Sequence, residues 1–535
     1  MAVIAHAAPP VCAWQTPTVV AGFNLADLFE LVADAVPERT AIVAGTTSRT
    51  YAQLDERATR LAHTLDVEPG AHVGCCLRNS IAHVELILAC YKARAVPINV
   101  NWRYTESEIA YLVDNADLVQ LWRDADVDND EYEARIASAS ATRDFGERSG
   151  DDHYVLYTGG TTGTPKGVVW RQEDIFFGAM GGGNPGGSPI TEPEAIVHSV
   201  LENPAQRLRA FLPADDPGPE QFVALGLGPL VHASGQWSVL GALFGGGKVV
   251  LSTDEHFDAT RVLDLIEAES VNTCNVVGDA TARPLLTGLR AHPKRWNTGT
   301  LRLLGSGGAI LSADVKQGLM DELPSLLAIV EGIGSSESPA QAVAVTTRAG
   351  KTAPSLTFAA KAETMIVDDE LQPILAGSGI VGRLATRGRV PLGYYKDAER
   401  SARTFVEIDG QRWSLPGDMA TIDADGTIHL LGRGSQCVNT GGEKVYPEEV
   451  EAVLKSADGV VDAAVVGEPD EHYGERVVAV IAATDVTEPP TLEELQAHCR
   501  ERLAGYKVPR ALRIVPEIKR SAAGKVDYTW ARATT

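Results

Sequence analysis

The residues from Tyr157 to Gly167, YTGGTTGTPKG, have the composition of a loop that holds phosphate groups. Glycines let the backbone turn tightly and bring its N–H groups close to phosphate oxygens, while threonine hydroxyls and a lysine add donors and positive charge. The residues that we assign to phosphate binding are Thr158, Gly159, Gly160, Thr161, Thr162, Gly163 and Lys166. Because Gly167 follows Lys166 where a Walker loop has Ser or Thr, the loop lacks the hydroxyl for magnesium of that motif. We therefore expect a pyrophosphate cradle and not a GTPase or motor.

Further strings resemble the motifs of a known superfamily, in the same order along the chain. The phosphate loop is similar to that of the adenylate-forming superfamily of acyl-CoA synthetases, nonribosomal peptide adenylation domains and luciferases. GPLVHASG at 228–235 resembles the segment that borders the acyl pocket, which implies that His232 positions the carboxylate or gates its approach. GSGGAIL at 305–311 resembles the adenine-pocket turn, so the resemblance assigns Gly308 and Ala309 to the base.

The string GIGSSES at 332–338 resembles the superfamily element that ends in a magnesium-holding glutamate. The resemblance places Glu337 at the carboxylate and Ser336 at the usual threonine. A hard cation that bridges phosphate oxygens needs such an anionic oxygen ligand. Ile333 replaces the usual aromatic residue, so we expect adenine to pack on an aliphatic face.

Two further positions resemble ribose and phosphate contacts. LPGD at 415–418 places Asp418 where family members bind the ribose hydroxyls, although Pro416 stands where threonine is common. One carboxylate can accept hydrogen bonds from both hydroxyls. Arg433 falls at the arginine that contacts ribose or phosphate.

The C-terminal strings resemble a hinge, a thiol tunnel and a mobile lysine. Gly434 and Ser435 fall at the interdomain hinge, where Asp or Lys is usual, and small residues there can absorb a large change of backbone angles. Gly441 and Gly442 resemble the turn that lines the pantetheine tunnel. KRSAAGKVDY at 519–528 places Lys525 at the catalytic lysine.

The resemblance implies two half-reactions in one site. A carboxylic acid and ATP give acyl-AMP and pyrophosphate, and acyl-AMP and coenzyme A then give acyl-CoA and AMP. Both the carboxylate and the phosphate are anionic, so Mg2+, Lys525 and the loop donors must cancel their repulsion. ATP, Mg2+ and coenzyme A are the cofactors that we expect.

Strings outside the superfamily motifs, such as GDATARPLL and GYYKD, resemble bacterial acyl-CoA synthetases that activate steroid side chains. Small residues around the expected acyl pocket would leave room for a ring system. They are Gly228, Ala233, Gly235, Gly305 and Gly307. We expect a steroid side-chain carboxylate or a medium-to-long fatty acid.

Three alternatives stay open. An acyl-AMP ligase that loads a carrier-protein thiol would keep every motif. A catalytically impaired binding or scaffold homologue is suggested by Ile333, Pro416 and Ser435, although retention of Lys166 and Lys525 argues against it. Luciferase chemistry has no discriminating residue in this chain.

The elements that must position these residues form an α/β pattern. Apolar runs such as 249–252 and 301–308 alternate with helical stretches such as 259–269, which predicts layered sheets flanked by helices. The stretches 178–189 and 203–220 are rich in Gly, Pro or charge and are predicted to be surface loops. From about residue 434 a small α+β pattern follows.

A chain of 535 residues exceeds what one hydrophobic core supports. We predict a loose N-terminal arm at 1–23, a large AMP-binding and acyl-substrate domain at 24–433, and a small mobile α+β C-terminal domain at 434–535. The net charge of -24 argues against a nucleic-acid partner. Scattered cysteines and the lack of a long apolar run favour a cytoplasmic protein without a transmembrane segment. The partners that we expect are small molecules, and a homodimer is left open.

Overall fold

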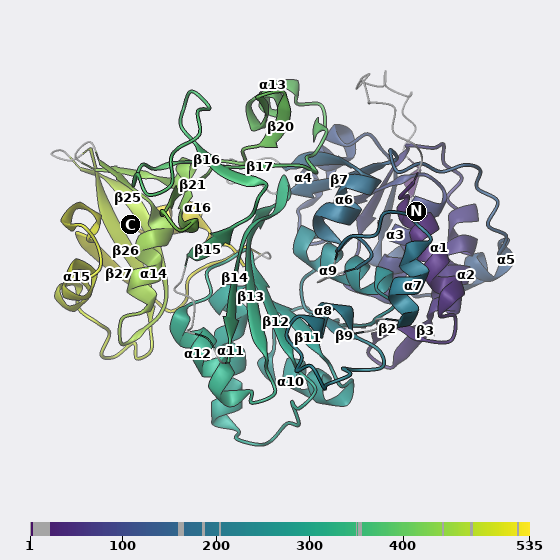
Figure 1. Ribbon diagram of the computed structural model, residues 1–535, viewed down its shortest axis with the longest axis horizontal. Coiled ribbons are helices and arrows are strands. Elements are labelled where there is room, and N and C mark those ends of the chain that lie inside the picture. The colour runs from purple at the N-terminus through teal and green to yellow at the C-terminus, as the bar shows by residue number, and fades with distance from the viewer. Residues whose placement is uncertain are drawn as a thin grey trace.

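The computed structural model describes residues 2–3, 22–158, 165–184, 188–202, 205–348, 350, 356–440, 443–470, 474–521 and 524–535. The predicted phosphate-loop residues Gly159, Gly160, Thr161, Thr162 and Gly163 lie outside the described residues, and so do Gly441 and Gly442. The predicted α/β class is confirmed, because helices flank layered sheets and a smaller α+β part lies at one end of the molecule (Figure 1).

A four-stranded sheet with the order β1-β6-β4-β5 forms an N-terminal layer. Its strands are β1 (Ala2–Val3), β4 (His72–Cys76), β5 (Val96–Asn99) and β6 (Leu118–Arg123). The helices of this part are α1 (Leu25–Ala35), α2 (Tyr51–His63), α3 (Ile81–Lys92), α4 (Glu106–Asn115) and α5 (Asp130–Ser138), with a 3-10 turn η1 (Asp124–Asp126). Thr50 and Gln53 form a capping box that fixes the start of α2. In the predicted N-terminal arm, Ala2–Val3 pairs with β6.

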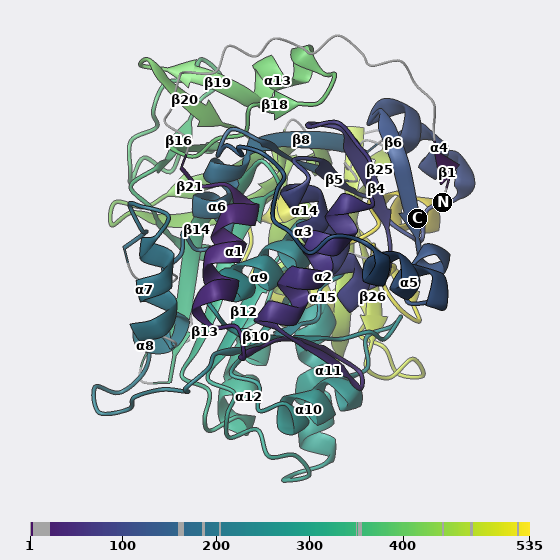
Figure 2. The same ribbon diagram turned by 90° about the vertical axis from the view of Figure 1, so that its right-hand side faces the viewer.

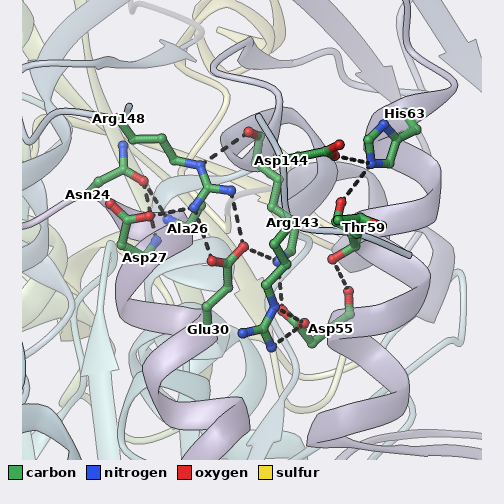
Figure 3. A network of polar contacts seen from close by, with 12 residues as sticks. Asn24, Ala26, Asp27, Glu30, Asp55, Thr59, His63, Arg143, Asp144 and Arg148 are labelled. Carbon is green, nitrogen blue, oxygen red and sulfur yellow. Dashed lines mark hydrogen bonds and ion pairs between the residues drawn. The ribbon is translucent and has the colours of Figure 1, made fainter. Parts of the chain in front are cut away.

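Buried charges tie the segment 139–150 to α1, α2 and α3 (Figure 3). Nζ of Lys92 lies 2.5 Å from Glu30 and 2.7 Å from Asp55, and its side chain is almost fully buried. Arg148 reaches Glu30 at 3.1 Å, and Arg143 reaches Asp55 at 2.7 Å. Each buried charge therefore has opposite charges beside it, as a buried ion requires.

The large sheet contains fifteen strands and carries the middle of the chain. Its first seven strands are β2 (Thr40–Ala44), β3 (Thr47–Thr50), β9 (Val223–Gly226), β10 (Lys248–Leu251), β11 (Thr273–Val276), β12 (Leu303–Gly307) and β13 (Ala328–Ser335). The remaining eight are β14 (Ser338–Thr347), β15 (Thr357–Ala360), β16 (Thr364–Val367), β17 (Gly382–Arg387), β19 (Phe405–Ile408), β20 (Gln411–Ser414), β21 (Asp418–Ile422) and β22 (Thr427–Arg433).

The parallel part of this sheet runs through β2, β10, β9, β11, β12 and β13. Its covering helices include α9 (Ala233–Phe244), α10 (Ala259–Ala268), α11 (Gly278–Ala291) and α12 (Ala313–Glu322). Apolar side chains of α10, α11 and α12 pack on the strands as one core, and these helices lie together in Figure 2. Ligands of such sheets bind outside the carboxyl ends of the strands, so the ends of β12 and β13 are the place to look for a site.

A three-stranded antiparallel sheet with the order β18-β8-β7 frames the phosphate loop. Strand β7 (His153–Thr158) ends where the loop begins, and β8 (Lys166–Arg171) starts after it, with Thr158 paired to Lys166. Strand β18 (Gly393–Tyr394) lies on the other side of β8 and leads to α13 (Ala398–Thr404). Helix α6 (Gln172–Ala179) follows β8 directly.

The small C-terminal part is a five-stranded sheet with helices on it. The strands are β23 (Val438–Thr440), β24 (Glu443–Val445), β25 (Val460–Asp470), β26 (Gly474–Ala483) and β27 (Ala511–Val515). The helices are α14 (Pro447–Lys455), α15 (Leu492–Arg500) and α16 (Tyr528–Thr534), with 3-10 turns η2 (Gly434–Gln436) and η3 (Gly505–Lys507). Pro447 stands at the first position of α14, where its missing N–H costs no hydrogen bond.

The described parts of both predicted surface loops contain buried residues. Met180 is fully buried in the first, and Ser199 of α7 (Ala195–Glu202) donates a hydrogen bond to the carbonyl of Gly183. The second contains α8 (Gln206–Arg209), whose Leu208 is fully buried. At Met180 and Leu208 the prediction of surface loops was wrong, because these apolar side chains are buried. Among the described residues, no helix is both long and apolar enough to cross a membrane.

Candidate active site

A cavity of about 540 Å³ opens at the carboxyl ends of β12 and β13, between the large part of the chain and α14 and α16. Most of the predicted site residues that the structure describes line it. They are Thr158, Lys166, Gly308, Ala309, Ser336, Glu337, Asp418, Arg433 and Lys525. The fold therefore brings together residues from six separate segments.

Glu337 and Lys166 form an ion pair at the phosphate-loop end of the cavity. Nζ of Lys166 lies 3.0 Å from Oε1 of Glu337, which sits on the turn between β13 and β14. Burial opposes the ionisation of Glu337, but Lys166, a hydrogen bond from Tyr394 and the charge of Arg433 outweigh it and lower the pKa of Glu337 to about 2. The carboxylate is ionised at neutral pH, as a metal ligand must be.

Asp418 and Arg433 face each other across the β21–β22 pair. Nε of Arg433 lies 2.8 Å from Oδ1 of Asp418. Oδ2 of Asp418 is buried and has no hydrogen-bond partner among the described residues. Burial raises the pKa of Asp418, against the pull of Arg433 and Lys525. A buried acceptor without a partner is costly, and a ligand with hydroxyl donors would satisfy it.

Lys525 reaches the cavity from the last loop before α16. Gly524 has a φ of +74°, and a Cβ there would lie 2.3 Å from a methyl group of Val277, so the loop fits tightly against the large part of the chain. Removal of water by the surrounding groups and the charge of Arg433 lower the pKa of Lys525, while Asp418 and Glu337 oppose this shift. The ammonium therefore lies in the field of the same two acids that line the cavity.

His232 precedes α9 and is not part of the lining of this cavity. Its Nε2 is buried and has no hydrogen-bond partner among the described residues. Burial and the positive charges of Lys525 and Arg103 lower the pKa of His232 to about 4. The imidazole is neutral at physiological pH, and its free nitrogen is close enough to Lys525 to feel its charge.

The part of the cavity around Gly308, Ala309 and Ile333, which the sequence assigned to adenine, has many apolar or small residues. Gly308 has a φ of +82°, a conformation that favours glycine, and Ala309 follows it. Ile333 lines the wall as predicted from its place in the sequence, and it packs beside Phe358 of β15, which also lines the cavity. Phe358 is an aromatic residue that the sequence motifs did not indicate.

The small residues expected to leave room for the acyl group have different environments. Gly228 and Gly235 pack against each other, since a Cβ on Gly235 would lie 2.7 Å from the carbonyl oxygen of Gly228. A Cβ on Gly305 would collide with Asn275. Gly307 lines the cavity, and its Cβ would approach no atom closer than 3.6 Å. Close packing explains the first three glycines, whereas a Cβ on Gly307 would meet only the carbonyl oxygen of Gly332, at ordinary contact distance.

The cavity also has charged residues that sequence reasoning missed. Arg400 and Arg403 of α13 line it, as do Glu448 and Glu451 of α14. A pattern in the sequence could have indicated the two glutamates, because their spacing of three places them on one face of a helix. Oε2 of Glu448 is buried without a partner among the described residues.

The predicted hinge residues lie between the two sheets. β22 ends at Arg433 in the large sheet, η2 contains Gly434 and Ser435, and β23 begins the small sheet. The N–H of Gly434 donates to the carbonyl of Gly417 at 3.1 Å.

The donor set fits one magnesium ion held jointly with phosphate oxygens. Glu337 offers an ionised carboxylate to the cavity. The described residues contain no cluster of three or more His, Cys, Asp or Glu that could hold a metal by itself. Magnesium bound to nucleotides commonly takes only one or two carboxylates from the protein.

Comparison with known proteins agrees with this geometry. Residues 29–395 match the AMP-binding enzyme family and residues 449–525 match the AMP-binding enzyme C-terminal domain. A 3-oxocholest-4-en-26-oate–CoA ligase from Rhodococcus rhodochrous is 42% identical, with 96% of each chain covered. A medium/long-chain-fatty-acid–CoA/3-oxocholest-4-en-26-oate–CoA ligase from Mycolicibacterium smegmatis is 40% identical, with 96% of each chain covered.

The fold also matches solved structures. ATP-bound MatB from Rhodopseudomonas palustris superposes with a TM-score of 0.78 at 24% identity, over 95% of this chain and 98% of MatB. The order of the motifs and the match to the family and its relatives over most of the chain lead to one assignment. This chain belongs to the AMP-binding enzyme family, within the group of AMP-forming acid–CoA ligases.

Proposed function

We propose that this chain converts a carboxylic acid and ATP into an acyl-adenylate and then transfers the acyl group to coenzyme A. One observation carries the proposal: the charged residues that line this one cavity include three basic and two acidic side chains that the sequence motifs had indicated, from distant segments. They are Lys166, Arg433, Lys525, Glu337 and Asp418. This charge pattern suits a nucleotide with an anionic co-substrate.

In the first half-reaction, two anions must approach each other. Lys525 would neutralise the charge that develops on the α-phosphate and the attacking carboxylate. Lys166 and Thr158 would hold the leaving pyrophosphate, and Asp418 would accept hydrogen bonds from the ribose hydroxyls. The neutral imidazole of His232 would orient the carboxylate without forming an ion pair with it.

The remaining nucleotide contacts would be made by backbone and small side chains. Gly308 and Ala309 would lie against adenine, Ser336 would donate to phosphate, and Ile333 would give adenine an apolar face. Bound Mg2+ would supply a Lewis acid for the phosphate oxygens, with Glu337 as its protein ligand.

In the second half-reaction, the thiol of coenzyme A must reach the carbonyl carbon that Lys525 now screens. We propose that residues 434–535 rotate relative to residues 24–433 about Gly434 and Ser435. The change of sheet between β22 and β23 supports a boundary there. Hinges are commonly a few residues at the ends of elements, as these are.

The preferred acid is a steroid side-chain carboxylate or a medium-to-long fatty acid. The names of the two relatives at 40% and 42% identity support this choice.

The test is to incubate the purified protein with ATP, Mg2+ and a panel of steroid side-chain and fatty acids, with and without coenzyme A. Mass spectrometry would then identify the products. We expect acyl-CoA and AMP. Acyl-AMP that accumulates in the presence of coenzyme A would contradict the thiol acceptor and indicate a carrier protein. The absence of AMP with every acid would contradict the proposal as a whole.

A further inference from the structure

The hydroxyl of Tyr394 lies between the two charged groups at the phosphate-loop end of the cavity. Nζ of Lys166 donates to this hydroxyl at 2.9 Å, and the hydroxyl donates to Oε1 of Glu337 at 2.6 Å. The direction is fixed, because an ammonium can only donate and an ionised carboxylate can only accept. Nζ of Lys166 also lies 4.3 Å from the centre of the Tyr394 ring.

The surrounding structure holds Tyr394 firmly in this place. Its side chain is almost fully buried, and its ring centre lies 5.4 Å from that of Phe405. Its N–H donates to Oγ of Ser401 at 2.8 Å, and that hydroxyl donates to the carbonyl of Asp397 at 2.6 Å. Burial and the nearby charge of Glu337 raise the pKa of Tyr394, so the phenol keeps its proton.

Under the proposed function, Oε1 of Glu337 must interact with protein donors in one state and with a cation in another. It now accepts from both Lys166 and Tyr394, yet it would have to face a cation when Mg2+ and ATP enter. Lys166 would have to turn toward phosphate at the same moment. Opening a buried ion pair leaves both charges uncompensated unless another group takes over.

We propose that Tyr394 is a positioning residue for an exchange of partners at the ion pair. In this exchange Glu337 releases Lys166 and binds magnesium, and Lys166 turns to phosphate. The phenol oxygen retains Lys166, and the phenol proton retains Glu337, while the direct ion pair opens. This inference rests on the proposed function and adds to it a residue to which the sequence analysis assigned no role.

The test is Tyr394→Phe, which keeps the ring and removes only the hydroxyl. Calorimetry would measure ATP affinity with Mg2+ and in EDTA, and the quantity of interest is the factor by which Mg2+ strengthens binding. We expect this factor to fall about tenfold, because the lost hydrogen bond is to a charged group. The KM for ATP should also rise more than kcat falls.

The matched control is Tyr395→Phe. The neighbouring phenol also donates to a carboxylate, at 2.8 Å, but that carboxylate is Asp117 and not Glu337. In this variant we expect Mg2+ to strengthen ATP binding by the same factor as in the wild type. If Tyr394→Phe does not fold, Ser401→Ala can be used instead, because it removes the hydroxyl that accepts the N–H of Tyr394. This variant should also lower the factor by which Mg2+ strengthens ATP binding, but by a smaller amount.

Two results would overturn the inference. An unchanged factor in Tyr394→Phe, with the wild type showing a clear magnesium effect, would remove the assignment of Tyr394 and leave the proposed function standing. A wild-type protein whose ATP affinity does not depend on Mg2+ would overturn the proposed function and this inference with it.

Discussion

Nε of Arg433 lies 2.8 Å from Oδ1 of Asp418, while Oδ2 of the same buried carboxylate has no partner among the described residues. The guanidinium binds one oxygen, and the other is a buried acceptor without a donor among the described residues. Such an arrangement selects for a ligand that brings a hydroxyl donor.

We predict that Asp418→Asn weakens ATP binding about tenfold, because an amide is a poorer acceptor than a carboxylate. The wild type should bind ATP more tightly than 2′,3′-dideoxy-ATP, and the variant should lose this preference. Asp423→Asn, at an exposed carboxylate near the other end of the same strand pair, is the control. If the Asp418→Asn variant still distinguishes the two nucleotides, the ribose assignment is contradicted.

Lys525 should matter for only one half-reaction. Lys525→Ala should slow acid-dependent adenylate formation by about a hundredfold, the usual cost of a charge that stabilises a transition state. Thioester formation from a supplied acyl-adenylate should remain largely intact. Rapid-quench assays of each half-reaction, with the exposed Lys519→Ala as control, would check this. Equal loss in both would contradict the role.

The carboxyl groups of Glu448 and Glu451 predict a pH dependence of stability. Burial and mutual repulsion raise the pKa of Glu448 to about 8, and burial raises that of Glu451 to about 7, although Lys455 opposes the latter shift. Asp418 adds to the repulsion at Glu448, while Arg520 and Tyr528 favour ionisation of Glu451. The folded protein therefore holds protons that the unfolded chain releases above pH 4.5.

The free energy of unfolding should then fall as pH rises from about 4.5 to 8, by up to about 1.4 kcal/mol per pH unit for each retained proton. Glu448→Gln should make the thermal transition less sensitive to pH across this window. Calorimetry of this variant beside the exposed Glu493→Gln would measure the difference. Identical slopes for Glu448→Gln and the wild type would contradict the prediction.

The buried charges around α1 predict a large loss of stability when one charged side chain is replaced by an uncharged one. Arg148→Met would leave Glu30 with one fewer compensating charge, and breaking a buried pair typically costs about 3 to 5 kcal/mol. Arg123→Met removes an exposed ion pair with Glu106 and should shift the denaturation midpoint far less. Urea unfolding of both variants would show whether burial sets the cost.

The sequence indicated the charged residues of the candidate site more readily than the residues that contact and position them. The order of motifs indicated Lys166, Glu337, Asp418, Arg433 and Lys525, because each lies in a short string with its own composition. Tyr394 could not be separated from Tyr395, since strand pairing between β18 and β8 decides which of the two faces the ion pair.

The surroundings of the glycine residues were harder to predict from the sequence than those of the charged residues. Gly228 and Gly307 look alike in the sequence, but a Cβ on Gly228 would crowd the backbone of Gly235, whereas a Cβ on Gly307 would meet only one atom, at ordinary contact distance. The α/β class was predictable from alternating apolar and helical runs. The burial of Met180 and Leu208 in predicted surface loops was not, because single anchoring side chains leave no periodic pattern.

The central claim is that the acid attacks the α-phosphorus of ATP. The most direct measurement uses an acid labelled with 18O in its carboxylate, together with ATP, Mg2+ and coenzyme A, and follows the label by mass spectrometry. Adenylate formation predicts that AMP carries one 18O atom, because thiol attack on the carbonyl carbon leaves the bridging oxygen on phosphorus. Unlabelled AMP, or label found in pyrophosphate or inorganic phosphate, would contradict the account.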